Sequence, residues 1–219
     1  MKPLLPNPIW SSLTTEQARL AIPVGNALRY PAEIAPFHAV AEAGVPVEAE
    51  AVLAHGDAVF VGVHPEVRGA CEVRHGVAIQ MVYGGGSSVP EAIEGEAELT
   101  DGQEMSELID LAYPGYFRPG TARLGRYVGI RVHGLLVAMA GERMHTTGLR
   151  EISGVCTRPG FTGRGYATHL VRRLLRFTPE ERSFLHVDFG NERATAVYRS
   201  LGFEECGELE ILRLSRAAG

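Results

Sequence analysis

The sequence lacks any long apolar segment. None of its apolar runs approaches the about 20 residues that a membrane-spanning helix requires, so we expect no transmembrane helix. The N-terminal segment Met1–Trp10 has neither a long apolar core nor a small-residue cleavage site, so it is not a signal peptide. We therefore predict a protein with no membrane partner.

Cysteine is scarce. The chain has three cysteines, Cys71, Cys156 and Cys206, which are too few and too scattered for a disulfide framework. The reducing cytoplasm is therefore the predicted compartment. The eight histidines show no H-E-x-x-H spacing and the cysteines no C-x-x-C spacing, so we predict no metal site.

The sequence also has no excess of basic over acidic residues. The chain has 21 Lys and Arg against 26 Asp and Glu, a formal net charge of −5. This balance argues against nucleic acid as a partner, because nucleic-acid-binding proteins usually carry a basic surface. The length of 219 residues, 45% of them hydrophobic, allows one large globular domain or two small ones.

What the sequence does contain is a strand, a glycine-rich loop and a helix in succession over residues 151–176. The apolar run Ile152–Cys156 predicts the strand, and Gly160, Gly163 and Gly165 lie in the loop. One helical face then follows, formed by Ala167, Leu170, Val171, Leu174 and Leu175. A helix N-terminus carries about half a positive charge and up to four unpaired N–H donors, so this junction is suited to a phosphate or pyrophosphate.

The spacing within the loop separates it from the best-known phosphate loops. No Lys followed by Ser or Thr comes after the last glycine, as a P-loop requires, and the order G-x-x-G-x-G is not the dinucleotide order G-x-G-x-x-G. The segment T-G-R-G-Y-A, Thr162–Ala167, resembles the R/Q-x-x-G-x-G/A signature of the GNAT superfamily of acyl-CoA-dependent N-acetyltransferases. Gly165 and Ala167 match its last two fixed positions, whereas Thr162 replaces the Arg or Gln expected first.

A second motif strengthens the resemblance. The segment D-F-G-N-E-R-A-T-A-V-Y-R-S-L-G-F, residues 188–203, is similar to the GNAT element N-x-x-A-x-x-x-Y-x-x-x-G-F. Asn191 is a favourable N-cap, and Gly202 suits the position just past the end of a helix. In the family this helix packs beside the thioester end of the cofactor.

The resemblance implies a mixed α/β fold of the α+β type. We expect a central mixed, mostly antiparallel sheet that is splayed at the acyl-CoA site and flanked by helices. The GNAT domain is predicted over residues 94–219. Residues 1–93 form an N-terminal region, either a degenerate GNAT-like half or a cap on the acceptor side. The Gly/Ser tract 84–88 between the two is predicted to be a linker rather than a phosphate loop, because Pro90 and no helical pattern follow it.

Outside the motifs, local patterns predict further elements. T-T-E-Q, Thr14–Gln17, resembles a capping box that begins a helix. Strands are predicted at Tyr127–Val132 and Leu135–Met144, joined by a His133-Gly134 turn. In the last predicted strand, Glu208–Ser215, the apolar phase shifts by one residue at Leu212, which indicates a bulge or burial on both faces.

If the resemblance holds, acetyl-CoA lies in the gap between the strand that begins at Glu151 and the strand near Phe184–Phe189. The free edge of the first strand would pair with the amide-rich pantetheine arm. The loop N–H groups would hold the pyrophosphate, with Arg158 and Arg164 adding charge. The implied cofactor-binding residues are Val155, Cys156, Thr157, Thr162, Gly163, Arg164, Gly165, Tyr166, Ala167 and Asn191.

Acetyl transfer to an amine requires a general base and a proton for the leaving thiolate. The candidates for the base are Glu151, at the start of the core strand, and Glu142, in the preceding strand; either could instead pair with Arg143 or Arg150. A base that works near neutral pH would need its pKa raised by burial. Tyr198 is the candidate acid, because a phenol with an ordinary pKa of about 10 is protonated at neutral pH.

Three other features have two interpretations each. Cys156 is either a nucleophile or, as is common for cysteine, a buried apolar residue. His145 and His186 either line the acceptor pocket or satisfy local hydrogen bonds. Arg172, Arg173 and Arg176 form either a solvated helix face or a contact to the 3′-phosphate of the cofactor.

The sequence thus predicts an acyltransferase that moves an acetyl group from acetyl-CoA to a primary amine of a small molecule or amino acid by direct attack. The alternatives are a non-catalytic acyl-CoA-binding or regulatory module and a transferase for a bulkier acyl group. Acetyl-CoA is the only cofactor expected, as a co-substrate.

Overall fold

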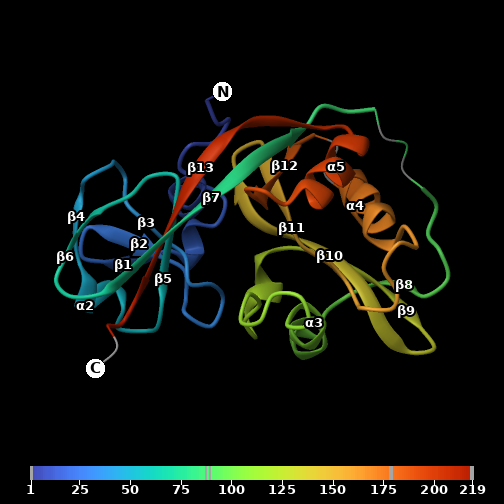
Figure 1. Ribbon diagram of the computed structural model, residues 1–219, viewed down its shortest axis with the longest axis horizontal. Coiled ribbons are helices and arrows are strands. Elements are labelled where there is room, and N and C mark those ends of the chain that lie inside the picture. Colours follow the sequence, from blue (N-terminus) through green and yellow to red (C-terminus); the bar gives the residue numbers. More distant parts are fainter. Residues whose placement is uncertain (1, 87, 89, 178–179, 218–219) are drawn as a thin grey trace.

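Two long strands, β7 (Glu72–Tyr83) and β13 (Phe203–Ser215), connect the two lobes of the computed structural model. They pair with each other along their length and run from the N-terminal lobe into the larger lobe, which contains most of the remaining chain (Figure 1). The structure describes residues 2–86, 88, 90–177 and 180–217.

The remaining elements lie on either side of this strand pair. The helices are α1 (Pro8–Thr14), α2 (Ala49–Val52), α3 (Gly102–Ile109), α4 (Tyr166–Phe177) and α5 (Glu192–Ser200), with 3-10 turns at Ala18–Leu20 and Thr121–Leu124. The other strands are β1 (Ile22–Val24), β2 (Ala27–Arg29), β3 (His38–Ala39), β4 (Pro46–Glu48), β5 (Ala58–Val61), β6 (Glu66–Arg68), β8 (Glu96–Glu98), β9 (Tyr127–Val132), β10 (Leu135–Thr146), β11 (Leu149–Thr157) and β12 (Arg182–Asp188).

The central sheet has eight strands in the order β5-β13-β7-β12-β11-β10-β9-β8. The β11–β12 pair is parallel, and the other neighbouring pairs are antiparallel. Helices flank the sheet on both faces. The predicted mixed, mostly antiparallel sheet flanked by helices is therefore confirmed.

Alternating side chains give the sheet two apolar faces. Ala138 and Ala140 of β10 pack with Leu170 of α4 in one core, which also includes α5 residues. Met139, between them in sequence, points to the opposite face and packs with Met105 of α3. Burial on both faces explains why β10 reads as a near-continuous apolar run, since neither side of the strand is left to water.

The N-terminal lobe contains two smaller sheets, β1-β2-β3 and β4-β6, together with α2. Its core packs Phe60 of β5 against Leu212 and Leu214 of β13. Strands β5 and β7, which precede residue 94, are thus part of the same sheet as the motif-bearing strands. The division at residues 93 and 94 stays a prediction about where the recognisable motifs begin.

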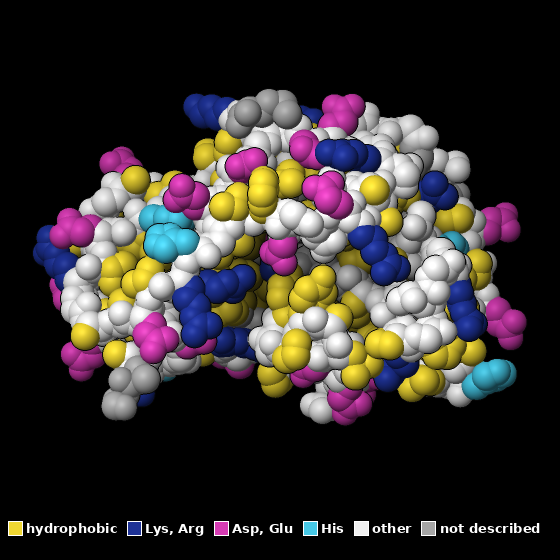
Figure 2. Space-filling view, in the orientation of Figure 1, with side chains coloured by type: hydrophobic (Ala, Val, Ile, Leu, Met, Phe, Trp, Pro, Cys, Tyr) yellow, Lys and Arg dark blue, Asp and Glu magenta, His cyan; other side chains and the backbone are white. Residues whose placement is uncertain are grey.

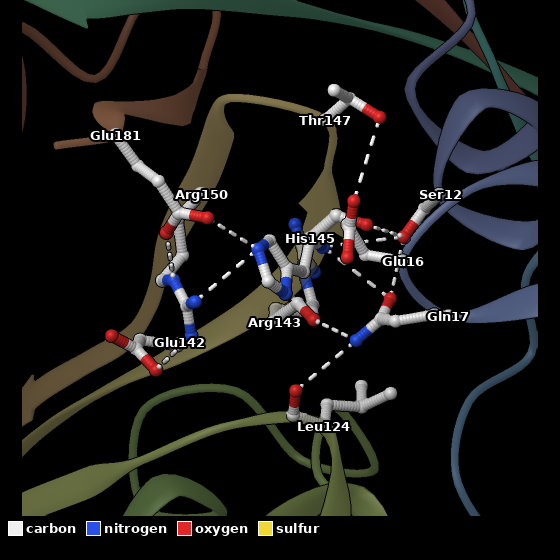
Figure 3. Close-up of polar contacts among 10 residues, drawn as sticks. All are labelled: Ser12, Glu16, Gln17, Leu124, Glu142, Arg143, His145, Thr147, Arg150 and Glu181. Carbon is white, nitrogen blue, oxygen red and sulfur yellow. Dashed lines mark hydrogen bonds and ion pairs between the residues drawn. The ribbon is translucent and has the colours of Figure 1, made fainter. Parts of the chain in front are cut away.

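Helix α1 shows a prediction that is wrong. Thr14, expected to begin a helix, is the last residue of α1, whose start is set by Pro8 at its first position. Gln17 does not form a capping box; its side chain is buried and donates to the carbonyl oxygens of Leu124 and Arg143 at 3.1 and 2.9 Å. Figure 3 shows Gln17 and Ser12 meeting β10 from the side of α1.

The second motif folds as predicted. Asn191 caps α5, with its side-chain oxygen accepting from the Ala194 N–H at 3.1 Å. Gly202 follows the helix with a φ of 91°, a left-handed conformation that favours glycine. Strand β9 has the predicted bounds, and His133 and Gly134 form the turn into β10.

The phase shift in β13 reflects burial on both faces. Ile211 packs into the core shared with α1, and Leu212 packs into the core of the N-terminal lobe. The irregularity in strand pairing lies earlier, between Glu205 and Gly207. Of the two interpretations, two-sided burial therefore applies at Leu212.

The connection from β7 to β8 has no regular secondary structure among its described residues and runs around the outside of the larger lobe (Figure 1). The predicted linker 84–88 lies at its start; Ser87 is outside the described residues. The end of the expected tail, Ala218 and Gly219, also lies outside them. Within the described part of the chain, no helix is long and apolar enough to cross a membrane.

Candidate active site

Strands β11 and β12 are paired over only part of their length. The pairs are Leu149–Arg182, Arg150–Ser183 and Glu151–Phe184. Beyond them, β11 continues along β10, whereas β12 continues along β7, and no further pair joins their described residues. The two strands therefore diverge, and one edge of β11 beyond Glu151 is left without a strand partner, as the resemblance implied.

The glycine-rich loop lies at the wide end of this divergence, directly before α4. Gly163 and Gly165 have φ values of 78° and 79°, which L-residues rarely adopt. A Cβ built on either glycine meets no atom within 4 Å, so the backbone here borders open space. Uncovered amides at a helix N-terminus are suited to an anion such as a pyrophosphate.

A first cavity of about 560 Å³ follows β11, the loop and α5. All ten predicted cofactor-binding residues line it: Val155, Cys156, Thr157, Thr162, Gly163, Arg164, Gly165, Tyr166, Ala167 and Asn191. The cavity thus has an amide-rich strand edge along one wall and a helix N-terminus at one end. This combination fits a long chain containing amides and ending in a pyrophosphate.

A second cavity of about 200 Å³ adjoins the first. The residues that line both are Tyr113, Val155, Asn191, Ala194 and Tyr198. Burial raises the pKa of Tyr198, with a smaller contribution from Tyr116, so its phenol is protonated at neutral pH. The predicted acid therefore lies where the two cavities meet.

Glu151 lies at the closed end of the strand pair and is fully buried. Its carboxylate accepts two hydrogen bonds from Arg143, at 2.6 and 2.8 Å, and lies 2.8 Å from His186 Nδ1. Burial alone would raise the pKa of Glu151, but Arg143 and His186 outweigh it and lower the pKa to about 2. The raised pKa that a direct base requires is therefore not found, and Glu151 lines neither cavity.

Glu142 is also paired with an arginine. Its carboxylate accepts from Arg150 Nη1 at 3.0 Å and from the Arg126 N–H at 3.0 Å. Figure 3 shows Arg150 between Glu142 and Glu181. Glu142 lines neither cavity, so its placement favours the structural interpretation, an ion pair with Arg150.

The two motif histidines have different positions. His145 lies 2.7 Å from Glu181 and joins the ion-pair cluster of Figure 3. His186 lines the second cavity. Its Nδ1 donates to Glu151, which leaves Nε2 as the unprotonated nitrogen, 3.1 Å from the side-chain nitrogen of Gln80. His186 thus makes local hydrogen bonds and also lines a cavity; that this cavity takes the acceptor stays a prediction.

The two arginines near the glycine-rich loop, Arg158 and Arg164, also have different positions. Arg164 lines the first cavity, and its guanidinium lies 4.9 Å from the centre of the Phe161 ring. Arg158 donates to the carbonyl oxygen of Leu136 at 3.1 Å instead and is absent from the cavity lining. Of these two arginines, Arg164 is therefore the one that lies at the cavity.

On α4, the interpretation of the basic cluster as a solvated face is wrong for Arg173. Its Nε donates to Glu96 at 2.6 Å, and the neighbouring His169 lies 2.7 Å from the same carboxylate. This cluster ties α4 to β8. A further arginine, Arg193 at the start of α5, lines the first cavity, although no motif position had indicated it.

Cys156 is buried among apolar residues, and burial raises the pKa of its thiol to about 12. The thiolate, which is the nucleophilic form, is therefore scarce at neutral pH. The interpretation as a buried apolar residue applies.

Three cavity residues have no signal in the linear sequence. Tyr113 and Tyr116 come from the irregular segment after α3, and Arg213 comes from β13. The Tyr116 hydroxyl accepts from Arg143 at 2.7 Å and lies 3.1 Å from the Ser153 hydroxyl. Long-range packing alone brings these side chains to the second cavity.

Comparisons with known proteins agree with this geometry. Residues 127–212 match the model of a family described as FR47-like protein. A crystal structure from Novosphingobium aromaticivorans DSM 12444, described as belonging to the GNAT family, superposes with a TM-score of 0.82 at 31% identity, covering 98% of this chain and 99% of that one. A GCN5-related N-acetyltransferase from Kribbella flavida shares the fold, with a TM-score of 0.55 at 18% identity, covering 96% and 93% of the two chains.

Curated relatives match over a shorter stretch. N-alpha-acetyltransferase RimI of Mycobacterium tuberculosis is 38% identical over 84 residues, 37% of this chain and 53% of that protein. An uncharacterized protein of Mycobacterium leprae is 39% identical over 84 residues, 37% of this chain and 23% of that protein. The chain thus spans about half or less of the length of these relatives.

The fold is therefore one that is shared with a class of acetyltransferases. Given its similarity to the Novosphingobium protein over nearly the whole of both chains, the chain belongs to the GNAT family of acetyltransferases.

Proposed function

We propose that the protein is an N-acetyltransferase that moves an acetyl group from acetyl-CoA to the primary amine of a small molecule or amino acid. The amine attacks the thioester carbonyl directly, with no covalent acyl-enzyme. A cytoplasmic location, in keeping with the three free cysteines, belongs to the same proposal.

One observation carries this proposal: the two cavities meet at Tyr198. The first has the shape and donors for acetyl-CoA, with its pyrophosphate at the α4 N-terminus and its pantetheine arm along β11. The second would then hold the acceptor. A reacting amine and a thioester held side by side need no further diffusion to meet.

His186 is the proposed base. Its ring lines the acceptor side, and Glu151 holds its Nδ1 proton, so Nε2 accepts the proton of the amine directly or through a water. In the resting protein Gln80 donates to that nitrogen and must give way. Glu151, one of the two bases expected from the sequence, acts through His186 and is a positioning residue.

Tyr198 is the proposed acid. As the amine nitrogen bonds to the carbonyl carbon and the carbon–sulfur bond breaks, the sulfur of CoA takes the phenol proton. Burial keeps the Tyr198 phenol protonated at neutral pH, so its proton is available at the moment the carbon–sulfur bond breaks. The proton left on His186 returns to solvent, and that on Tyr198 is replaced from it.

A polypeptide N-terminus is a second acceptor class. The match to N-alpha-acetyltransferase RimI favours it, because that protein is named for transfer to an α-amine. Both acceptor classes would use the same site around Ala194 and Tyr198. The two proposals therefore differ only in which acceptor enters the second cavity. Assays with short peptides and free amines separate the two.

The first test is thermal unfolding with acetyl-CoA, using ATP and NAD as controls. A ligand at a hundred times its Kd stabilises a protein by about 2.7 kcal/mol, which appears as a clear rise in Tm. We expect this rise with CoA thioesters only, and its loss in Gly165→Glu, which places a carboxylate in the proposed pyrophosphate site.

Succinyl-CoA and longer acyl-CoAs in the same assay test acyl preference. Release of free CoA with an amine panel then tests turnover. Binding of acetyl-CoA with no turnover of any amine or peptide would favour the non-catalytic module, a reading that Thr162 at the first signature position supports. Absence of any shift at millimolar acetyl-CoA would refute the proposed function.

A further inference from the structure

An arginine without an acidic partner lies on the wall of the second cavity. Arg213 of β13 lines this cavity and is exposed to solvent. Among the described residues it has no ion pair or side-chain hydrogen bond, whereas Arg143, which donates to Tyr116 of the same cavity, is paired with Glu151. Figure 2 shows that this face of the molecule is hollowed near its centre, with Lys and Arg side chains gathered beside the hollow.

The strand register places Arg213 on the same face as the catalytic end of β12. Asp188 is opposite Ala78 on β7, and Arg213 is opposite Arg74 on the same strand. Residues 74 and 78 are separated by an even number of positions, so their side chains share one face.

The charges around Arg213 favour an anion. Arg74, directly across the strand pair, brings a second positive charge, and like charges in this position repel. Glu72 offsets it only partly, at 3.8 Å from Arg74. The same cavity is lined by Asp188 and His186, which lie opposite Ala78 and Gln80 on β7. The cavity thus has a carboxylate, Asp188, beside His186 and a guanidinium, Arg213, four positions farther along β7.

We propose that the acceptor carries a carboxylate, which Arg213 binds, while its ammonium group is drawn to Asp188 and loses its proton to His186. The acceptor class is therefore an amino acid in the broad sense, a small amine with an acid group at its other end. This inference rests on the proposed function and assigns its specificity. Arg213 does not touch the reacting atoms; it selects and orients the acceptor.

The same charges disfavour two other acceptor classes. A diamine would place its second ammonium against Arg213, and a lysine-rich peptide would add further positive charges there. A neutral amide of the same shape would lose only the charge-assisted bond, which is about twice as strong as a neutral one. The expected order of acceptors is therefore acid, then amide, then diamine.

The test uses matched acceptors with acetyl-CoA and measures both CoA release and acceptor binding by saturation-transfer NMR. Glycine, β-alanine and γ-aminobutyrate move the carboxylate away from the amine one methylene at a time. Their amides, and ethylenediamine, trimethylenediamine and putrescine, are the neutral and cationic counterparts. Phenylalanine, its amide and phenethylamine form an aromatic set, because Tyr113 and Tyr116 line the cavity.

The test variant is Arg213→Gln, with Arg213→Lys as the conservative change. Because Arg213 is exposed, the substitution leaves the apolar cores untouched, and unchanged Tm verifies this. The matched control is Arg216→Gln, an exposed arginine farther along the chain whose contact is the Leu53 carbonyl oxygen. We expect Arg213→Gln to lower kcat/KM for the acids about tenfold or more, through KM, with amides little changed. Arg213→Lys recovers part of the loss.

The outcomes separate this inference from the proposed function. If acetyl-CoA does not bind, the proposed function fails, and the acceptor inference falls with it. If acetyl-CoA binds, the inference is overturned when amides or diamines match the acids, when Arg213→Gln leaves their ranking unchanged, or when no acid binds or reacts. Preference for acids that is lost in Arg213→Gln and kept in Arg216→Gln supports it.

Discussion

The two ends of the β11–β12 pair have opposite character. At the paired end, Glu151 is fully buried and bound to Arg143 and His186. At the divergent end, β11 lines a cavity together with a glycine-rich loop. The same two strands thus supply a rigid, charged junction and an open site.

The contrast shows how the site is held open. Two strands that diverge give up backbone hydrogen bonds, and those groups need another partner, water or ligand. The ion pair between Glu151 and Arg143 lies at the point where the strands separate, and both residues are bonded to further side chains. The paired end therefore maintains the geometry that leaves the other end free to bind.

The largest expected effect concerns the divergent end. Tyr198→Phe removes the proposed proton donor and should lower kcat by about 10²–10⁴-fold, because a general acid typically contributes this much. Acetyl-CoA affinity should hardly change, since the phenol ring and its packing remain. Steady-state kinetics together with a calorimetric Kd check this, and full activity in the variant would remove the acid role.

Breaking the paired end should cost stability. Glu151→Ala leaves the Arg143 guanidinium buried without its carboxylate, which typically costs about 3–5 kcal/mol. Chemical unfolding measures the loss. The control is Glu98→Ala, since Glu98 and Arg126 form an exposed pair at 3.4 Å that contributes at most about 1 kcal/mol. Equal losses in the two variants would contradict the special role of the junction.

Strong acid should weaken the paired end of the two strands by protonating Glu151. The pKa of Glu151 falls from its ordinary value of 4.5 to about 2 in the folded protein. The folded state therefore binds this proton less readily than the unfolded state, so the stabilisation is present above about pH 4.5 and is lost as the pH falls toward 2. The difference corresponds to about 3 kcal/mol.

Unfolding free energies measured across that pH range test this expectation. In Glu151→Gln the free energy of unfolding should change less steeply with pH over the same range, because the titrating group is gone. An identical slope in both proteins would assign the acid sensitivity to other residues.

The smallest expected effect concerns acetyl-CoA affinity at the divergent end. Thr162→Arg restores the residue type that the signature expects and should tighten acetyl-CoA binding about tenfold, because a hydrogen bond to a charged group contributes about 1.5–3 kcal/mol. Thr147→Arg adds the same charge in the exposed β10–β11 turn and should leave the affinity unchanged. Calorimetric titration compares the two, and equal or weaker binding in Thr162→Arg would refute the expectation.

Local sequence signals were sufficient where the structure depends on neighbours along the chain. The apolar run of β9, the Asn191 cap and the glycine after α5 each act within a few residues, and all were predicted. The predicted helix start at Thr14 was wrong because Pro8 begins the helix six residues earlier. Two local signals for a helix start, Pro8 and the T-T-E-Q pattern at residues 14–17, are present there, and the helix begins at the proline.

The candidate site was predictable to the extent that motifs carry it. The loop, β11 and α5 residues were identified, and the structure brings them to one cavity. The acceptor side was not, because Tyr113, Tyr116 and Arg213 come from segments far apart in sequence. Nor did local pattern indicate that β7 of the N-terminal region lies between β12 and β13.

The sequence by itself determined the family, the glycine-rich loop and the order of the elements around it, because glycine conformation, helix capping and apolar periodicity are local properties. The tertiary structure decided the chemistry of the buried groups. Whether Glu151 is a free base or the partner of Arg143 depends on which charges lie within a few ångströms, and only the packed sheet brings those charges together.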